Sequence, residues 1–246
     1  MHMKKTALIT GATRGIGNEI AKTFATDGYN VVINYLNSEE TAEYLCSQLY
    51  EKGYNAMKVK ADVSNREEVE MMIKTVQKKF GDVDVLVNNA GIAQQKLFTE
   101  ISNLDWDRIF DVNVKGVFNC SQMVLPKMIH KKRGKIINIS SMWGLTGASC
   151  EVHYSASKAA VIGLTKALAK EVGPSNIQVN CVAPGVIDTD MNADLNNQDI
   201  EDIKEQTPLG MIGSAKDIAE TVLFLASDKA NFITGQIISP NGGMVI

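Results

Sequence analysis

The stretch TALITGATRGIG, residues 6–17, joins a short apolar run to a glycine-rich turn and then to a helical pattern. Its three glycines permit a tight turn and bring backbone N–H groups close to a pyrophosphate, whose charge the following helix N-terminus stabilises. A plain tight turn is the alternative, but strand, glycine turn and helix in this order predict a dinucleotide-binding unit. The turn residues expected at the cofactor are Gly11, Thr13, Arg14, Gly15, Ile16 and Gly17.

Seven short apolar runs alternate with longer helical patterns along the chain. The expected strands cover residues 6–10, 30–35, 56–61, 83–89, 134–140, 177–184 and 236–241. Several are apolar almost throughout, which is typical of strands covered on both faces. Right-handed strand–helix–strand units build a parallel sheet with helices on both faces. We therefore predict one doubly wound α/β (Rossmann) domain over residues 1–246, with strand order 3-2-1-4-5-6-7 and helices ending at Gly28, Gly53, Gly81 and Gly134.

Composition narrows the function classes. The 246 residues are 45% hydrophobic and 22% charged, and the net charge is −3, which argues against a nucleic-acid or membrane-surface binder. No apolar run approaches the roughly 18 residues of a membrane span. The four cysteines lie far apart, without a CxxC pair or a histidine cluster at ligand spacing. We therefore expect a cytoplasmic protein without a metal site.

Seven motifs follow one another in a fixed order. They are TGATRGIG (10–17), NNAG (88–91), DVNVKG (111–116), ISS (139–141), YSASK (154–158), APGVIDTDM (183–191) and ITGQIISPNGGM (233–244). This order resembles the short-chain dehydrogenase/reductase family from end to end, and within it the bacterial 3-oxoacyl-[acyl-carrier-protein] reductases. The resemblance implies an NAD(P)-dependent oxidoreductase that reduces a ketone to a secondary alcohol. The implied substrate is a 3-oxoacyl chain on acyl carrier protein or coenzyme A, in fatty acid biosynthesis.

The resemblance also assigns four catalytic residues. Reduction of a ketone needs a hydride for carbon and a proton for oxygen, and Tyr154 is implied as the proton donor. Lys158, one helical turn away, is expected to lower the pKa of that phenol and to bind the nicotinamide ribose. Ser141 would hold the substrate oxygen, and Asn113 would seat a water that relays protons to Lys158. The alternatives are a surface packing pair for Tyr154 and Lys158, a strand-end turn for Ser141 and a helix kink or cap for Asn113.

Further cofactor residues are implied after the other strands. Asp62 and Val63 are expected at the adenine, Asn89, Ala90 and Gly91 near the ribose, and Pro184, Gly185, Ile187 and Thr189 along the nicotinamide, with Tyr154 and Lys158 touching the cofactor as well.

The end of the second strand bears on cofactor choice. An acid there would bind the adenosine 2′-hydroxyl, but INYLNS (33–38) contains none, and Asn37 stands in this segment. Arg14 can offer a charged fork to a 2′-phosphate. We therefore expect NADP(H) to be favoured over NAD(H). The alternative for Arg14 is an exposed loop arginine.

The substrate is less well defined. Carrier-protein reductases present two arginines to the acidic carrier, and the matching positions here are Lys132 and Ser175, so only one is basic. The loop SSMWGLTGASCEVHYSASK (140–158) resembles bacterial elongation factor P 5-aminopentanone reductases, which reduce a ketone on a modified lysine. Glu151 could pair with an amine on such a substrate, and a solvated loop acid is the alternative. Trp143, Cys150 and His153 receive no role.

Two expectations concern motion and assembly. The polar segment 188–208 lies where substrate must enter, and we expect a mobile lid, with a fixed helix pair as the alternative. The apolar end Met244–Ile246 of an edge strand and the apolar helices at 118–132 and 157–172 favour covering by other subunits. The resemblance implies a homotetramer. A non-catalytic dinucleotide sensor is the alternative from another class, although the chain retains both Tyr154 and Lys158.

Overall fold

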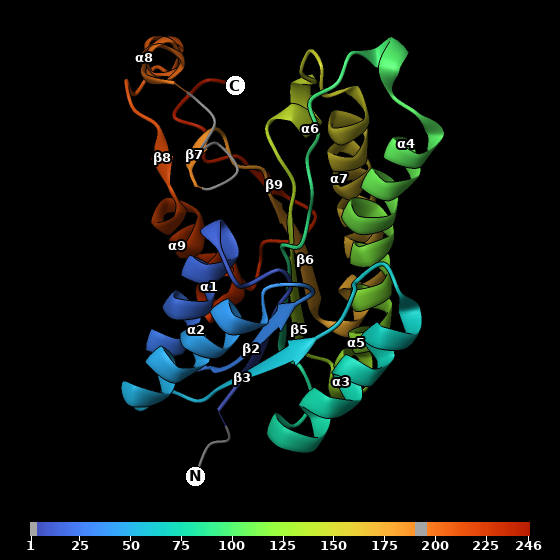
Figure 1. Cartoon of the computed structure of the whole chain (residues 1–246). Helices are drawn as coiled ribbons and strands as arrows, with labels where there is room; N and C mark the ends of the chain where they lie inside the picture. The colour runs from blue at the N-terminus through green and yellow to red at the C-terminus, as the bar shows by residue number, and fades with distance from the viewer. Residues whose placement is uncertain (1–3, 190–195) are drawn as a thin grey trace.

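A parallel sheet of seven strands forms the centre of the molecule (Figure 1). The computed structural model describes residues 4–189 and 196–246. Its sheet order is β3-β2-β1-β4-β5-β6-β9, which confirms the predicted fold and order. The strands are β1 (Thr6–Ile9), β2 (Asn30–Tyr35), β3 (Ala56–Lys60), β4 (Val85–Asn88), β5 (Gly134–Ile139), β6 (Ile177–Val182) and β9 (Ile237–Ile238).

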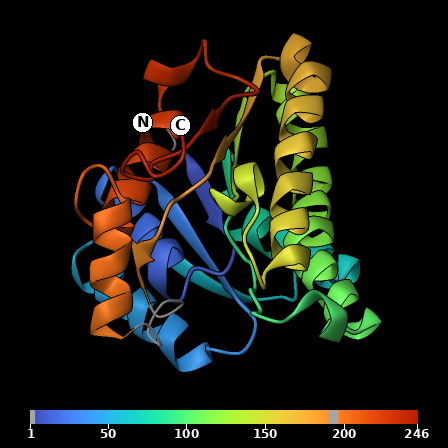
Figure 2. The same ribbon diagram turned by 90° about the horizontal axis from the view of Figure 1, so that it is seen from above.

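Helices cover both faces of this sheet. One face carries α1 (Gly15–Thr26), α2 (Glu39–Glu51) and α9 (Ala215–Ala226), and the other carries α3 (Arg66–Phe80), α4 (Asn103–Phe110), α5 (Gly116–Lys131) and α7 (Val152–Val172). The view from above in Figure 2 separates the two helical layers. In β1, Ala7 and Ile9 join one hydrophobic cluster while Leu8 joins the other, because alternate side chains of a strand point to opposite faces.

Shorter elements connect these layers. They are η1 (Phe98–Glu100), the π-helical segment η2 (Asp111–Lys115), α6 (Trp143–Thr146), η3 (Gly173–Ser175), α8 (Asn197–Gln206), η5 (Asp228–Ala230), and the strands β7 (Ile187–Asp188) and β8 (Gly213–Ser214). β7 and β8 form a second, two-stranded parallel sheet that the sequence did not predict. Within 4–189 and 196–246, no helix is both long and apolar enough to cross a membrane.

Three of the four glycines expected to end helices do so. Gly28, Gly53 and Gly81 follow α1, α2 and α3 with positive φ angles of 89°, 80° and 81°. The expectation was wrong for Gly134, which begins β5, because Lys132 takes the left-handed position after α5 with a φ of 49°. Gly134 is needed for space instead, since a Cβ there would lie 2.4 Å from Met128 Sδ.

The last strand is shorter than expected. β9 covers only Ile237–Ile238 of the expected 236–241. Backbone bonds to the segment that follows β6 nevertheless continue as far as Pro240, whose carbonyl accepts from Gly185 N at 3.0 Å. Pro240 lacks an N–H group and cannot extend the ladder further. β9 lies at the edge of the sheet, which confirms the predicted edge strand.

Candidate active site

The glycine loop after β1 is held by buried polar side chains from neighbouring strands. Asn34 in β2 accepts a hydrogen bond from Gly11 N at 3.2 Å through Oδ1. The Asn89 side chain donates to the carbonyl oxygens of Thr10 and Gly11 at 2.9 and 3.0 Å. Thr10 Oγ1 accepts in return from the backbone N–H groups of Asn89 and Ala90. Asn89, predicted near the ribose, thus uses its side chain to brace the loop.

Close packing explains the glycine spacing. Gly11 has a φ of 60°, and a Cβ there would lie 2.9 Å from Ala90 Cα. A Cβ on Gly17 would lie 2.4 Å from Asn89 Nδ2 and 2.5 Å from the Gly11 carbonyl oxygen. Both positions therefore exclude any side chain, because the loop packs closely against the residues that follow β4.

The start of α1 fits a dinucleotide phosphate. The first N–H groups of a helix have no acceptor within the helix, and Arg14 at the N-cap makes no side-chain capping bond. Within the described part of the chain, the exposed Arg14 guanidinium has no hydrogen-bond or ion-pair partner. Thr13 is buried beneath the loop, and Ile16 packs against the core. The residues present thus offer free donors and a free cation to an anionic cofactor.

Two acidic side chains that follow β2 in the sequence are paired with Lys58 of β3. Lys58 lies 2.8 Å from Glu39 and 2.9 Å from Glu43, and its ammonium stands 5.8 Å from the centre of the Tyr35 ring. Asn37 is exposed nearby in sequence. Glu39, the first acid after β2, is therefore paired with Lys58, whereas the Arg14 guanidinium has no partner in the described residues.

Asp62 and Val63 are fixed at the end of β3. Asp62 Oδ1 accepts from Ser64 N at 2.9 Å and from Ser64 Oγ at 2.7 Å. The Val63 carbonyl accepts from Asn119 of α5 at 2.9 Å. A surface hollow beside Asp62 is lined by Asp62, Ser64, Asn65, Arg66, Glu67 and Lys115, and the adenine contacts of Asp62 and Val63 stay a prediction.

Tyr154 and Ser141 come together at the end of β5. Tyr154 is 8% exposed, and burial raises the pKa of its phenol to about 12. A hydrogen bond with Ser141 acts in the opposite direction, and the nearby Glu151 carboxylate raises the pKa further. Ser141 Oγ also accepts from Trp143 N at 3.2 Å, which fixes the hydroxyl at the start of α6.

Lys158 lies close to the Tyr154 ring, and burial is the largest influence on the pKa of both groups. Its ammonium stands 5.6 Å from the centre of the Tyr154 ring and donates to the Ile139 carbonyl at 3.0 Å. Lys158 is fully buried, and this burial lowers its own pKa to about 8. Desolvation therefore favours the neutral form of each group in the chain without ligand, and the lowering of the Tyr154 pKa by Lys158 stays a prediction.

Asn113 lies in the π-helical segment η2 and bonds to the loop after β4 and to α7. Its Oδ1 accepts from Ile92 N at 2.9 Å, and its Nδ2 donates to the Ile92 carbonyl at 2.9 Å and to Ser157 Oγ at 3.0 Å. Both amide hydrogens are therefore used, so a water here can only donate to Asn113. A Cβ on Gly91 would lie 3.2 Å from both Asn113 Oδ1 and Lys158 Nζ, which places these two groups around the same glycine. Such π segments are frequent at functional sites.

The segment after β6 closes the site. The Pro184 carbonyl accepts from Met142 N at 2.9 Å, and a Cβ on Gly185 would lie 2.7 Å from Asn241 Cα. Ile187 is buried in β7, and Thr189 lies beside the glycine loop, 3.4 Å from the Cβ position of Gly15. The segment thus links the ends of β1, β5 and β6. In the segment 188–208, residues 190–195 lie outside the described residues, so the lid stays a prediction.

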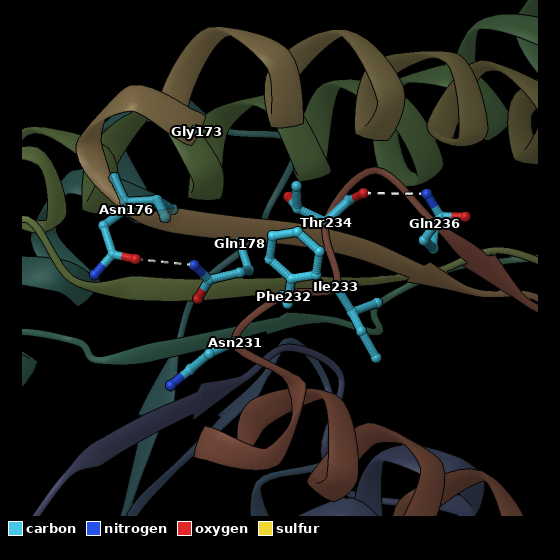
Figure 3. A pocket seen from close by; sticks show the side chains of 9 residues that line it. Gly173, Asn176, Gln178, Asn231, Phe232, Ile233, Thr234 and Gln236 are labelled. Atoms are coloured by element: carbon cyan, nitrogen blue, oxygen red, sulfur yellow. Dashed lines mark hydrogen bonds between the residues drawn. The ribbon is translucent and has the colours of Figure 1, made fainter.

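Figure 3 shows a hollow that does not belong to this site. It has a volume of about 440 Å³ and is lined by Gly173, Asn176, Ile177, Gln178, Asn231, Phe232, Ile233, Thr234 and Gln236. These residues lie at the amino ends of β6 and β9, whereas the predicted site residues follow the carboxyl ends of the strands. Within 4–189 and 196–246, no group of three or more His, Cys, Asp or Glu side chains is placed to hold a metal ion.

Comparison with known proteins agrees with this geometry. A family model described as "Enoyl-(Acyl carrier protein) reductase" matches residues 11–245. The chain is 48% identical over 244 residues to the 3-oxoacyl-[acyl-carrier-protein] reductase FabG of Staphylococcus aureus (strain MW2), covering 99% of both chains. It is 44% identical over 241 residues to the FabG of Aquifex aeolicus, covering 98% of this chain and 97% of that one. With its glycine loop and its Ser–Tyr–Lys arrangement, the chain belongs to the short-chain dehydrogenase/reductase family and is an oxidoreductase that uses a nicotinamide dinucleotide.

Proposed function

We propose that this protein reduces a 3-oxoacyl group on acyl carrier protein or coenzyme A to the 3-hydroxyacyl form with NADPH. The observation that carries the proposal is the buried contact between Tyr154 and Ser141, with the Lys158 ammonium behind the phenol ring. The names of the FabG relatives support the same substrate class.

The site residues have separate tasks in this reaction. When bound, a reduced nicotinamide would supply the hydride that the carbonyl carbon needs. Ser141 donates a hydrogen bond to the carbonyl oxygen and stabilises the negative charge that develops there. Tyr154 keeps its proton at neutral pH and transfers it to that oxygen, since an alkoxide is a stronger base than a phenolate. Lys158 would hold the ribose of the cofactor, and its ammonium would favour the phenolate left behind.

The preference for NADPH rests on Arg14. Its guanidinium is exposed and has no partner in the described part of the chain, while Lys58 of β3 is paired with Glu39 and Glu43. A 2′-phosphate on the adenosine ribose gives Arg14 a charge-assisted bond that a 2′-hydroxyl cannot match.

A direct assay tests the proposal and separates an enzyme from a dinucleotide sensor. Purified protein is mixed with NADPH and acetoacetyl-CoA, and the absorbance of the reduced nicotinamide is followed. We expect oxidation of NADPH by the natural chain and none by Tyr154→Phe. NADPH binding without turnover of any ketone would favour the sensor.

Docking of an acyl carrier would use the surface around Lys132. The Lys132 carbonyl accepts from Asn176 Nδ2 at 3.1 Å, so the end of α5 meets the turn after α7 where Ser175 lies. One lysine supplies the positive charge where carrier-protein reductases present two arginines. We therefore expect kcat/KM for an acyl carrier protein substrate to exceed kcat/KM for acetoacetyl-CoA by a smaller factor than in such reductases.

A second substrate is favoured by Glu151. One carboxylate oxygen of Glu151 is buried without a hydrogen-bond partner in the described residues, and burial raises the pKa of this group. An amine on a substrate of the kind that elongation factor P 5-aminopentanone reductases reduce would pair with this carboxylate. Turnover of modified elongation factor P, lost in Glu151→Gln while acetoacetyl-CoA reduction persists, is the expected result. No preference of the natural chain over Glu151→Gln for the amine substrate would contradict this role.

We also propose that the protein is a homotetramer. Phe118 and Ile129 of α5 are 46% and 44% exposed, and Ile246 at the end of the chain is fully exposed. The tail also packs on its own chain, where Asn241 Nδ2 donates to the Val245 carbonyl at 2.7 Å. Light scattering should give four chains for the intact protein and fewer after truncation at Gly243. A monomer at micromolar concentration, or a tetramer of the truncated chain, would contradict the proposal.

A further inference from the structure

The first turn of α7, which carries Tyr154, lacks the usual means of stabilising a helix start. Glu151 occupies the N-cap but makes no side-chain capping bond. The first backbone N–H groups of any helix have no acceptor within the helix. Without a capping side chain to accept from them, such a turn frays readily. A proton donor needs a fixed position, so another part of the molecule must hold this turn.

Three consecutive residues of the loop after β4 contact the residues that lead into Tyr154. Gln94 Oε1 lies 3.0 Å from His153 Nε2, and Lys96 N donates to the Cys150 carbonyl at 2.7 Å. Gln95 forms a side-chain hydrogen bond with Glu151. The 94–96 loop thus lies against the start of α7, with the two chain directions opposed.

The orientation of the Gln94 amide is set from α4. Gln94 Nε2 donates to Asp105 Oδ1 at 3.0 Å, which leaves Oε1 to accept from His153. Asp105 is itself held by Lys96 Nζ at 2.8 Å and by the backbone N–H and hydroxyl of Ser102 at 2.9 and 2.6 Å. His153 must therefore carry its proton on Nε2. Its Nδ1 is buried without a partner in the described residues, and burial lowers the pKa of the imidazole.

We infer that His153 is a positioning residue for Tyr154, held in place through Gln94 by Asp105. The side chain of His153, directly before Tyr154 in the chain, is fully buried and fixes the uncapped turn from the side of the 94–96 loop. This role rests on the proposed reductase function, because it concerns the proton donor of that reaction. It assigns the histidine a task in orientation and none in proton transfer to the substrate.

Two substitutions at residue 153 test the inference. The amide nitrogen of glutamine occupies nearly the place of His Nε2, so His153→Gln retains the donor to Gln94, whereas His153→Asn is too short to reach it. We expect kcat to fall about 10- to 100-fold in His153→Asn. KM and the NADPH dissociation constant should change by less than about twofold, because the substitution misplaces only the proton donor. His153→Gln should retain kcat within about threefold.

A second measurement does not depend on activity. Hydrogen exchange of the backbone amides at 152–156 should quicken about tenfold in His153→Asn and in Gln94→Ala, and remain near the natural rate in His153→Gln. The matched control is Gln178→Ala, which removes a glutamine amide bonded to Asn176 at 3.3 Å, away from the site. This control should leave both exchange and kcat unchanged.

The double variant decides whether Gln94 and His153 act through the same hydrogen-bonded connection. Gln94→Ala with His153→Asn should lose no more kcat than the worse single variant, because each breaks the same connection. Losses that multiply, an unchanged kcat in His153→Asn, or equal defects in His153→Gln and His153→Asn would overturn the inference. If the natural chain reduces no ketone, the proposed function fails, and the exchange rates still decide whether the 94–96 loop holds the turn.

Discussion

The glycine loop after β1 and the first turn of α7 lie at the same edge of the sheet but are built differently. The loop consists of backbone held by Thr10, Asn34 and Asn89, with no space for side chains at Gly11 and Gly17. The helix carries the buried ionisable side chains of Tyr154 in this turn and Lys158 in the next, and desolvation displaces the pKa values of both. Substitutions in the loop should therefore act through bulk and affect binding, whereas those in the turn should act through chemistry and affect turnover.

Among variants of these two regions, Tyr154→Phe should cause the largest change, and that change should be in turnover. The variant removes only the proton donor, so kcat should fall by about 10³-fold or more, while the NADPH dissociation constant stays within about twofold. Steady-state kinetics and fluorescence titration with NADPH measure the two quantities. More than a few per cent of residual kcat would show that another group supplies the proton. Lys158→Ala is the companion variant and should damage both binding and turnover.

Gly17→Ala should show the opposite pattern. A Cβ there would lie 2.4 Å from Asn89 Nδ2 and 2.5 Å from the Gly11 carbonyl oxygen, so the loop must shift. We expect a loss of about 2 kcal/mol in the free energy of unfolding and a large loss of cofactor affinity. Gly173→Ala is the control, because nothing lies within 4 Å of a Cβ at that position. Equal behaviour of the two variants in thermal melts and NADPH titration would refute the packing argument.

The buried lysine predicts a pH dependence of stability. Burial lowers the pKa of Lys158 from 10.5 to about 8, so between these values the unfolded chain binds the additional proton. The free energy of unfolding should therefore gain a contribution that rises with pH from about 8 to 10.5, by roughly 1 to 3 kcal/mol. Denaturant titration of the ligand-free protein should show this rise, and Lys158→Met should lack it. The same slope in both proteins would exclude Lys158 as its source.

Arg14→Ala should produce the smallest and most selective change. The loss of one charge-assisted contact at an exposed position should weaken NADPH about tenfold and leave NADH nearly unchanged. Asn37→Asp should move the preference in the same direction, because an acid repels the 2′-phosphate and accepts from the 2′-hydroxyl. Comparison of dissociation constants for the two cofactors measures both effects. Equal weakening of NADPH and NADH by Arg14→Ala would show that it does not contact the phosphate.

The sequence predicted those features that depend on local pattern. Alternating strands and helices specified the order of the seven strands, and glycine spacing located the loop, because both follow from backbone geometry over short stretches. It placed the end of α5 wrongly, since a left-handed Lys132 cannot be read from propensity while Gly134 stands two residues later.

The contacts missed by sequence reasoning join residues far apart in the chain. Gln94 and His153 are separated by 59 positions, and Gly11 and Asn34 by 23. A polar residue inside an apolar run, such as Asn34 in NVVINY, could have indicated a side chain that holds a neighbouring loop. His153 carried no such signal, because its partner is defined only by the packing of α4 and α7.

Asn34 also limits how this protein can be redesigned. Its side chain accepts from Gly11 N and donates to the Ala61 carbonyl at 3.0 Å, so one residue ties together the carboxyl ends of β1, β2 and β3. An engineer who transplants the segment after β2 from an NADH-dependent relative therefore has a natural boundary at residue 35. A graft that begins earlier and replaces Asn34 would alter cofactor preference and loosen the loop together, and the two effects could not be separated by selection for one cofactor.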